Sequence, residues 1–101
     1  MKGVRVSRDA ERDLDSIWRF IDAGSLPTAD KVIDSVVRHF ALLARQPHAG
    51  RMREDIAPGV RSLPSGNYLV YYRESRSYIV ISRILHAKRD QNEAWKKPKA
   101  T

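Results

Sequence analysis

Within the first quarter of the chain, a short alternation of apolar and polar positions is followed by a helical repeat. Residues 2–6 place Val4 and Val6 on one side, which predicts a short first strand. Ser7 is suited to cap a following helix, because its hydroxyl can accept a free amide of the first turn. The helix itself is indicated by apolar residues at spacings of four, three and four, namely Ala10, Leu14, Ile17 and Ile21. Ala23-Gly24 predicts its end, since glycine readily takes the left-handed conformation of a helix C-terminus.

A second helical pattern begins around Pro27, and either Ser25 or Thr28 fits the position of its N-cap. Pro47 and Gly50 predict where it stops. Its apolar stripe comprises Val32 or Ile33, Val36, Val37, Phe40, Leu43 and Ala44. Two amphipathic helices joined by a few residues predict a helical hairpin whose apolar stripes need a common partner surface.

After Gly50 the pattern becomes that of strands. Residues 51–58 have the composition of a charged loop or a frayed strand start. Three strands are predicted beyond them, at 60–63, 68–73 and 78–85, separated by turns at 64–67 and 74–77. The last strand is apolar on both faces at Ile79, Val80 and Ile81, which indicates a central position in the sheet. A short helical turn is expected at 93–96, ended by Pro98.

Helices followed by a run of strands predict the α+β class. We expect a short N-terminal strand, a two-helix hairpin, a three-stranded antiparallel meander packed on the helices as one sheet, and a short C-terminal helical turn or tail. The length of 101 residues predicts one domain over 1–101. The chain has no cysteine, which excludes disulfides and thiolate metal sites. No apolar run approaches the roughly 20 residues of a membrane span, so we expect a cytoplasmic protein without membrane contact.

Positive charge is concentrated in the second half of the chain. Residues 1–50 hold 8 Lys and Arg against 7 Asp and Glu, whereas residues 51–101 hold 11 against 5. The strands and the tail therefore carry most of the net charge of +7. Such a surface attracts phosphate backbones or acidic proteins, although charge alone also fits a merely well-solvated surface.

Four segments together resemble the RelE/ParE superfamily of bacterial toxin–antitoxin toxins. They are AERDLDSIWRFI at 10–21, FALLARQPHAGRMRED at 40–55, PGVRSLPSGNYLVYYR at 58–73 and ISRILHAKRD at 81–90. The order and the residues of these segments are most similar to the ParE branch, whose members poison DNA gyrase. The resemblance implies the toxin of a type II toxin–antitoxin system, which inhibits gyrase by binding and is silenced by a small cognate antitoxin.

The superfamily also contains ribosome-dependent mRNA endoribonucleases of the RelE type, which are the alternative. RNA cleavage needs cations to stabilise the phosphorane and a group that transfers protons. The candidates for this chemistry are Arg51, Arg53, Arg61, Arg89 and His86. Trp95 stands where such a ribonuclease often carries a C-terminal tyrosine, and an indole can stack on a base but cannot act as acid or base. The enzymatic role is therefore the less favoured one, and Tyr68, Tyr71 and Tyr72 are interpreted as sheet packing.

A gyrase inhibitor needs a recognition surface instead of a catalytic set. The candidates for target binding are Arg61, Arg83, Arg89, Trp95, Lys96 and Lys97, with a solvated tail as the alternative for the lysines. The candidates for antitoxin binding are Leu14, Trp18, Phe20 and Ile21. Trp18 and Phe20 cannot both lie on the apolar stripe of the first helix, so one of them is expected to face outward, with packing on the second helix as the competing explanation.

The remaining expectations follow from the same resemblance. The antitoxin and gyrase are the expected partners, and operator DNA is expected to be contacted only through the antitoxin. No cofactor, metal or small-molecule ligand is expected. A nucleic-acid-binding domain without toxic action is a third hypothesis, which steep salt dependence of DNA binding would indicate.

Overall fold

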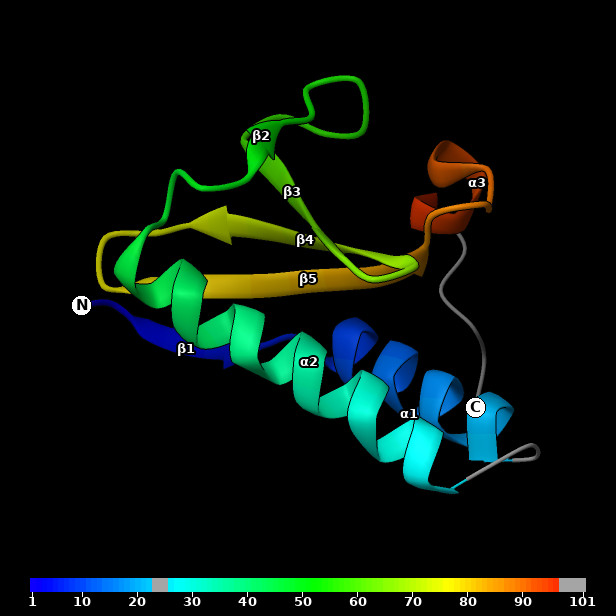
Figure 1. Ribbon diagram of the computed structural model, residues 1–101. Coiled ribbons are helices and arrows are strands. Elements are labelled where there is room, and N and C mark those ends of the chain that lie inside the picture. The colour runs from blue at the N-terminus through cyan, green and yellow to red at the C-terminus, as the bar shows by residue number, and fades with distance from the viewer. Residues whose placement is uncertain (23–25, 97–101) are drawn as a thin grey trace.

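The computed structural model describes residues 1–22 and 26–96, and for residues 21, 22, 26 and 27 it describes the helical backbone alone. Eight elements follow one another along these described residues (Figure 1). They are β1 (Gly3–Val6), α1 (Arg8–Asp22), α2 (Leu26–Arg45), β2 (Arg51–Met52), β3 (Val60–Ser65), β4 (Tyr68–Glu74), β5 (Tyr78–His86) and α3 (Gln91–Lys96).

The strands form one five-stranded mixed sheet in the order β1-β5-β4-β3-β2. The α+β class and the antiparallel meander of β3, β4 and β5 are confirmed. Two features of the sheet differ from the expectation. β1 pairs in parallel with β5 at one edge of the sheet, and the helical hairpin carries the chain from there across the sheet to β2 at the other edge. The segment expected as a charged loop or frayed strand contributes β2, which extends the sheet beyond β3.

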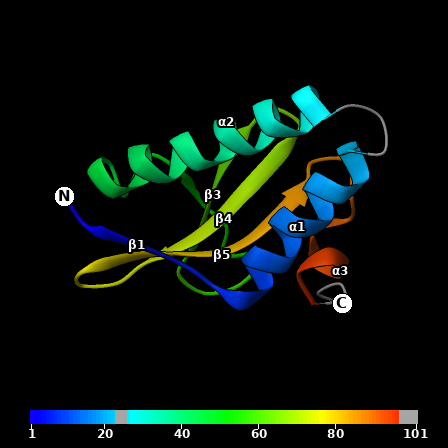
Figure 2. The same ribbon diagram turned by 90° about the horizontal axis from the view of Figure 1, so that it is seen from below.

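The two faces of the sheet are covered by different helices. α1 and α2 lie across one face, beneath the strands in Figure 1 and in front of them in Figure 2, which is seen from below. The main core is enclosed there, with Val36, Leu43, Ile79 and Ile81 among its fully buried members. α3 covers part of the opposite face, where Ala94 packs into a smaller cluster with Val60, Tyr71 and Leu85.

A β-bulge decides which way the second half of β5 faces. Tyr71 of β4 lies opposite Arg83, whereas its neighbour Tyr72 lies opposite Ile81, so Ser82 is the extra residue. The bulge reverses the alternation of β5 at this point. Ile84 therefore joins Ile81 in the core beneath the helices, and Arg83 falls on the side of α3.

The helix boundaries agree largely with the sequence pattern. Ser7 caps α1 as predicted, because its Oγ accepts the Ala10 amide at 3.1 Å. α2 begins at Leu26, so Thr28 lies inside the helix and is not its cap, while Ser25 and the predicted stop of α1 at Ala23-Gly24 lie outside the described residues. The β3–β4 turn is tighter than expected, because β3 continues to Ser65 and Gly66 takes the turn with a φ of 59°.

Candidate functional site

Asp13 of α1 forms a buried ion pair with Arg83 of β5. Arg83 Nε and Nη2 donate to the two carboxylate oxygens at 2.7 and 3.0 Å. Asp13 is 5% exposed and Arg83 is 2% exposed. Asp13 Oδ2 also accepts the Ile84 amide at 2.9 Å. Because β1 ends at Val6, this part of β5 has no strand on that edge, and Asp13 supplies the acceptor that a neighbouring strand would otherwise provide.

The same arginine holds α3 against the rest of the molecule. Arg83 Nη1 donates to the carbonyl oxygens of Ala94 and Trp95 at 2.7 and 3.0 Å. These carbonyls belong to the last turn of α3, where no intrahelical partner is available. Arg83 therefore ties together α1, β5 and α3. Arg83, expected from the sequence to bind the target together with Arg61 and Arg89, therefore has its guanidinium buried and occupied within the molecule.

Arg53 is also directed inward, although the pattern of residues 51–58 suggested a solvent-exposed charge. Its Nε and Nη2 each donate to one oxygen of Asp55 at 3.0 Å, and its Nη1 lies 3.3 Å from the Tyr71 hydroxyl. Tyr71 in turn donates to Gln91 Oε1 at 2.7 Å. The hydrogen bond from Arg53 lowers the pKa of the Asp55 carboxyl, and burial raises the pKa of the Tyr71 hydroxyl. Tyr71 is thus less able than a free tyrosine to give up a proton near neutral pH.

The five candidates for RNA cleavage divide between the two ends of the sheet. Three come from the β2–β3 edge and two from the end of β5 and the segment after it: Arg51, Arg53, Arg61, His86 and Arg89. Arg61 lies opposite Tyr72 of β4, whereas His86 lies opposite Tyr68, four residues along the same strand. That offset alone is about 13 Å. Arg61 also donates from Nη1 to the Gly50 carbonyl at 2.8 Å. The five side chains do not converge on one substrate position in this conformation.

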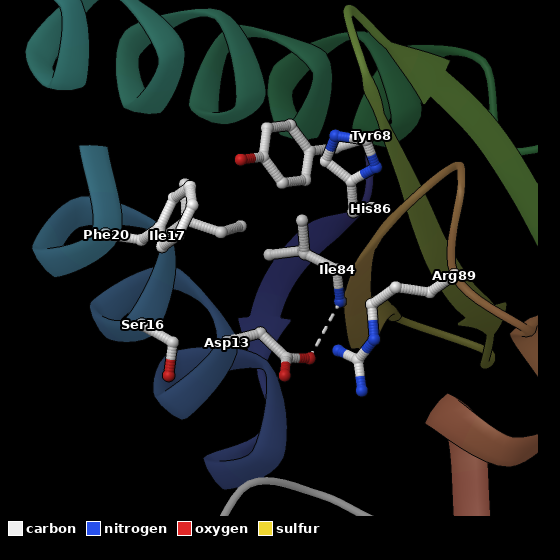
Figure 3. Close-up of a pocket in the computed structure, with 8 residues that line it drawn as sticks. All are labelled: Asp13, Ser16, Ile17, Phe20, Tyr68, Ile84, His86 and Arg89. Atoms are coloured by element: carbon white, nitrogen blue, oxygen red, sulfur yellow. Dashed lines mark hydrogen bonds between the residues drawn. The ribbon is translucent and has the colours of Figure 1, made fainter.

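A hollow of about 240 Å³ opens between α1 and the end of the β4–β5 pair. We call it the α1 pocket (Figure 3); it is lined by Asp13, Ser16, Ile17, Phe20, Tyr68, Ile84, His86 and Arg89. The His86 ring meets the edge of Tyr68 at a centroid distance of 5.2 Å. His86 Nδ1 accepts the Lys88 amide at 3.1 Å, which assigns the proton of the neutral ring to Nε2. The α1 pocket therefore combines an apolar floor with hydrogen-bond donors at its rim.

The residues expected to bind an antitoxin lie along α1. Phe20 is 80% exposed and Trp18 is 37% exposed, which confirms that an aromatic side chain faces outward there. Leu14 is half-buried and packs against the main core. The side chain of Ile21 lies outside the described residues. Phe20 borders the α1 pocket, so the exposed aromatic and the hollow form one continuous surface.

The residues expected at the C-terminal end of the target surface lie on α3. Trp95 is half-buried, with its ring edge-on to Tyr71 at 5.6 Å and the Arg73 guanidinium 5.9 Å from its centroid. Lys96 is exposed at the end of the helix. Lys97 lies outside the described residues.

Asp13 and Gln91 are the site residues that sequence reasoning missed. The sequence contains a signal that could have identified Asp13: it stands three residues after Ala10 and four before Ile17, which places a carboxylate on the apolar stripe. A charge in that position predicts a buried partner. Gln91 had no such signal: it is a polar residue at the start of a short helix, and only the fold brings it to Tyr71.

Within residues 1–22 and 26–96, no helix is long and apolar enough to cross a membrane. The same part of the chain contains no group of three or more His, Asp or Glu side chains placed to hold a metal ion.

Curated relatives match more than three quarters of the chain. Toxin ParE1 of Caulobacter vibrioides is 33% identical over 88 residues, which cover 85% of this chain and 90% of the relative. Toxin ParE1 of Mycobacterium tuberculosis is 28% identical over 87 residues, covering 84% and 89%. Toxin ParE3 of C. vibrioides is 30% identical over 80 residues, covering 78% and 80%.

Solved structures share the fold. The chromosomal ParDE TA system from P. aeruginosa contains a chain that superposes with a TM-score of 0.75 at 26% identity, covering 87% of this chain and 98% of that one. The toxin–antitoxin complex RelBE2 from M. tuberculosis contains one with a TM-score of 0.56 at 29% identity, covering 84% and 96%. The family described as ParE toxin of type II toxin-antitoxin system, parDE, matches residues 4–91. The chain therefore belongs to the ParE family of type II toxin–antitoxin toxins.

Proposed function

We propose that this ParE-type toxin binds DNA gyrase, stabilises the gyrase–DNA complex in its cleaved state, and is neutralised by a cognate antitoxin. Membership of the ParE family supports the toxic role. The observation that favours binding over catalysis is that candidate arginines are held by acceptors within the toxin itself. Arg53 is bound to Asp55 and Arg61 to the Gly50 carbonyl, while His86 and Arg89 lie at the other end of the sheet.

The proposed target surface is α3 together with the chain that follows it. Trp95 and Lys96 supply an aromatic anchor and a cation there, and Lys97 is expected to add a second cation. The hydrogen bonds from Arg83 to the Ala94 and Trp95 carbonyls fix the orientation of this helix. Arg61 and Arg83 are left out of the proposed surface, because their guanidinium groups are engaged within the molecule.

An antitoxin partner is supported by the solved relatives, which carry the descriptions ParDE TA system and toxin–antitoxin complex RelBE2. The net charge of +7 favours an acidic partner. Exposed Phe20 and Trp18 on α1 offer it apolar contact. A gyrase inhibitor acts where the chromosome is, so the proposal places the chain in the cytoplasm.

The decisive experiment is a gyrase supercoiling assay with the purified chain. The proposal expects loss of supercoiling and accumulation of cleaved DNA. Lys96→Glu is expected to require a toxin concentration about tenfold higher, a loss of about 1.4 kcal/mol in binding. Lys31→Glu, the same charge reversal at an exposed position of α2, is the matched control and should leave the concentration unchanged.

Unaffected supercoiling at saturating toxin would refute the gyrase target. A parallel in vitro translation reaction examines the alternative, in which mRNA would be cut at the ribosome and the cuts would disappear with Arg61→Ala or Arg89→Ala. Intact mRNA together with inhibited gyrase is the result expected here.

A further inference from the structure

The α1 pocket has an apolar floor and an exposed aromatic rim. Ile17 and Ile84, which are 8% and 2% exposed, lie beneath it. Phe20 stands at the edge with 80% of its surface in solvent. A large aromatic side chain beside an apolar hollow is costly to leave in water, and the combination is typical of a protein-binding surface.

The positive charge of Arg89 at the rim of the pocket has no counter-ion among the residues that the structure describes. Asp13 lines the wall, but Oδ1 accepts from Arg83 Nη2, and Oδ2 accepts from Arg83 Nε and the Ile84 amide. Its negative charge is thus already matched by Arg83. The Arg89 guanidinium makes no ion pair or side-chain hydrogen bond anywhere in residues 1–22 and 26–96. Figure 3 shows Arg89 across the hollow from Phe20, extending from the segment after β5.

We propose that the α1 pocket receives one large apolar side chain of the antitoxin, flanked by a carboxylate that pairs with Arg89. This inference rests on the proposed function and adds where the antitoxin is held and which chemistry it must present. His86 Nε2–H offers a second donor to the same acidic group. A carboxylate that displaces water above the apolar floor forms a stronger pair with arginine than one at an open surface.

The chemistry of the pocket favours an acidic polypeptide over the other occupants. Nucleic-acid binding depends on several cations that follow a phosphate backbone, whereas this pocket has a single arginine beside isoleucine and phenylalanine side chains. A second copy of the chain would bring a net charge of +7 against +7. An antitoxin segment with an apolar residue beside an acidic one can pack on the apolar floor and pair its carboxylate with Arg89 at the rim.

The position of Arg89 gives this contact a consequence for toxicity. Arg89 lies two residues before α3, which carries Trp95 and Lys96 of the proposed target surface. An antitoxin segment seated in the α1 pocket therefore covers Arg89 and reaches the edge of α3. Arg89, expected from the sequence to contact the target, is reassigned to the antitoxin, and neutralisation follows from overlap of the two surfaces.

The test measures the affinity between the toxin and the small protein encoded by the neighbouring reading frame, by calorimetry on purified partners. Arg89→Glu and Phe20→Ala are each expected to weaken binding at least tenfold. Arg76→Glu is the matched control: it reverses the same charge at an exposed position in the β4–β5 turn, at the other end of the sheet, and should change affinity less than threefold. Thermal melting of each variant verifies that the fold is kept.

The outcomes separate the two proposals. Wild-type binding with Arg89→Glu equal to Arg76→Glu overturns the pocket assignment and leaves the toxin–antitoxin function standing. No binding by wild type overturns both. If a DNA duplex displaces the partner from wild type but not from Arg89→Glu, the pocket is a nucleic-acid site and the assignment is wrong. Recovery of the Arg89→Glu complex by an acidic-to-arginine change in the partner is the positive result expected.

Discussion

Replacing Asp13 by asparagine tests the tie between α1, β5 and α3. The substitution keeps the size of the side chain and leaves an oxygen that can accept the Ile84 amide. It removes the negative charge that accepts Arg83 Nε and Nη2 at 2.7 and 3.0 Å. The Arg83 guanidinium, only 2% exposed, is then left without a counter-ion.

The magnitude follows from the burial of both partners. Breaking a buried ion pair by removing one member costs about 3–5 kcal/mol, because the remaining charge stays desolvated. A domain of this size has a total free energy of unfolding of about 5–15 kcal/mol. We therefore expect Asp13→Asn to lose a large part of the stability, and α3 to loosen, since Arg83 also holds the Ala94 and Trp95 carbonyls.

Urea unfolding followed by circular dichroism measures the loss, with Asp15→Asn as the matched control. Asp15 lies on the same helix and pairs with Arg19 at 3.1 Å, but the side chains are 48% and 73% exposed. Such a pair contributes about 0.3–0.5 kcal/mol. Equal losses in the two variants would refute the argument that burial makes the Asp13 pair decisive.

A double replacement separates stability from the positioning of α3. Asp13→Leu with Arg83→Met exchanges the ion pair for apolar side chains, a change that is often neutral or better in other proteins. We expect it to recover part of the stability lost in Asp13→Asn. Amide hydrogen exchange in α3 should nevertheless remain faster than in wild type, because the Ala94 and Trp95 carbonyls still lack their donor. Exchange in α3 as slow as in wild type would show that Arg83 does not position the helix.

Three further predictions concern the far edge of the sheet. Tyr72→Phe removes a buried hydroxyl that donates to a carbonyl at 2.7 Å and accepts the Gly50 amide at 2.8 Å. In urea unfolding we expect the free energy of unfolding to fall by about 1–3 kcal/mol, against less than about 0.5 kcal/mol for Tyr78→Phe at an exposed position. Similar losses in the two variants would contradict the role of burial. Gly50→Ala would place a Cβ 2.7 Å from the Tyr72 ring and 2.8 Å from a carbonyl oxygen of β3, so it should lower the thermal midpoint, and an unchanged midpoint would speak against this close packing. The hydrogen bond from Arg53 lowers the pKa of the Asp55 carboxyl below 3.8, so its contribution to stability is present above the unfolded pKa and is lost as the pH falls through the folded pKa. Asp55→Asn should therefore make stability fall less steeply at acid pH. An unchanged acid dependence would contradict this.

The elements of this fold could be predicted because their signals are local. Ser7 caps α1 through an amide three residues away, and the stripe of Ala10, Leu14 and Ile17 repeats within one helix. The meander was equally visible, since alternating aromatic and β-branched residues are interrupted by Gly66 at a turn. The outward aromatic on α1 followed from the same geometry: two positions two residues apart cannot share one helical face.

The arrangement of the sheet was decided by contacts far apart in the chain. Nothing near Val4 indicates that β1 lies parallel to β5, more than 70 residues away. Nor does the run of residues 78–85 reveal that Ser82 is bulged out. That single extra residue turns Arg83 away from the core face and brings Ile84 into it, because a shift of one residue exchanges the two faces of a strand.

The sequence by itself therefore determined the family, the α+β class and the basic character of the second half of the chain. Only the tertiary structure decided which arginines are free to bind a partner. Arg83 and Arg53 are engaged internally by Asp13 and Asp55, whereas the Arg89 guanidinium beside the α1 pocket has no ion pair within residues 1–22 and 26–96. The physical reason is that a guanidinium is available to a partner only when no acceptor of its own molecule occupies it, and the carboxylate that neutralises Arg83 stands 70 residues away in the chain.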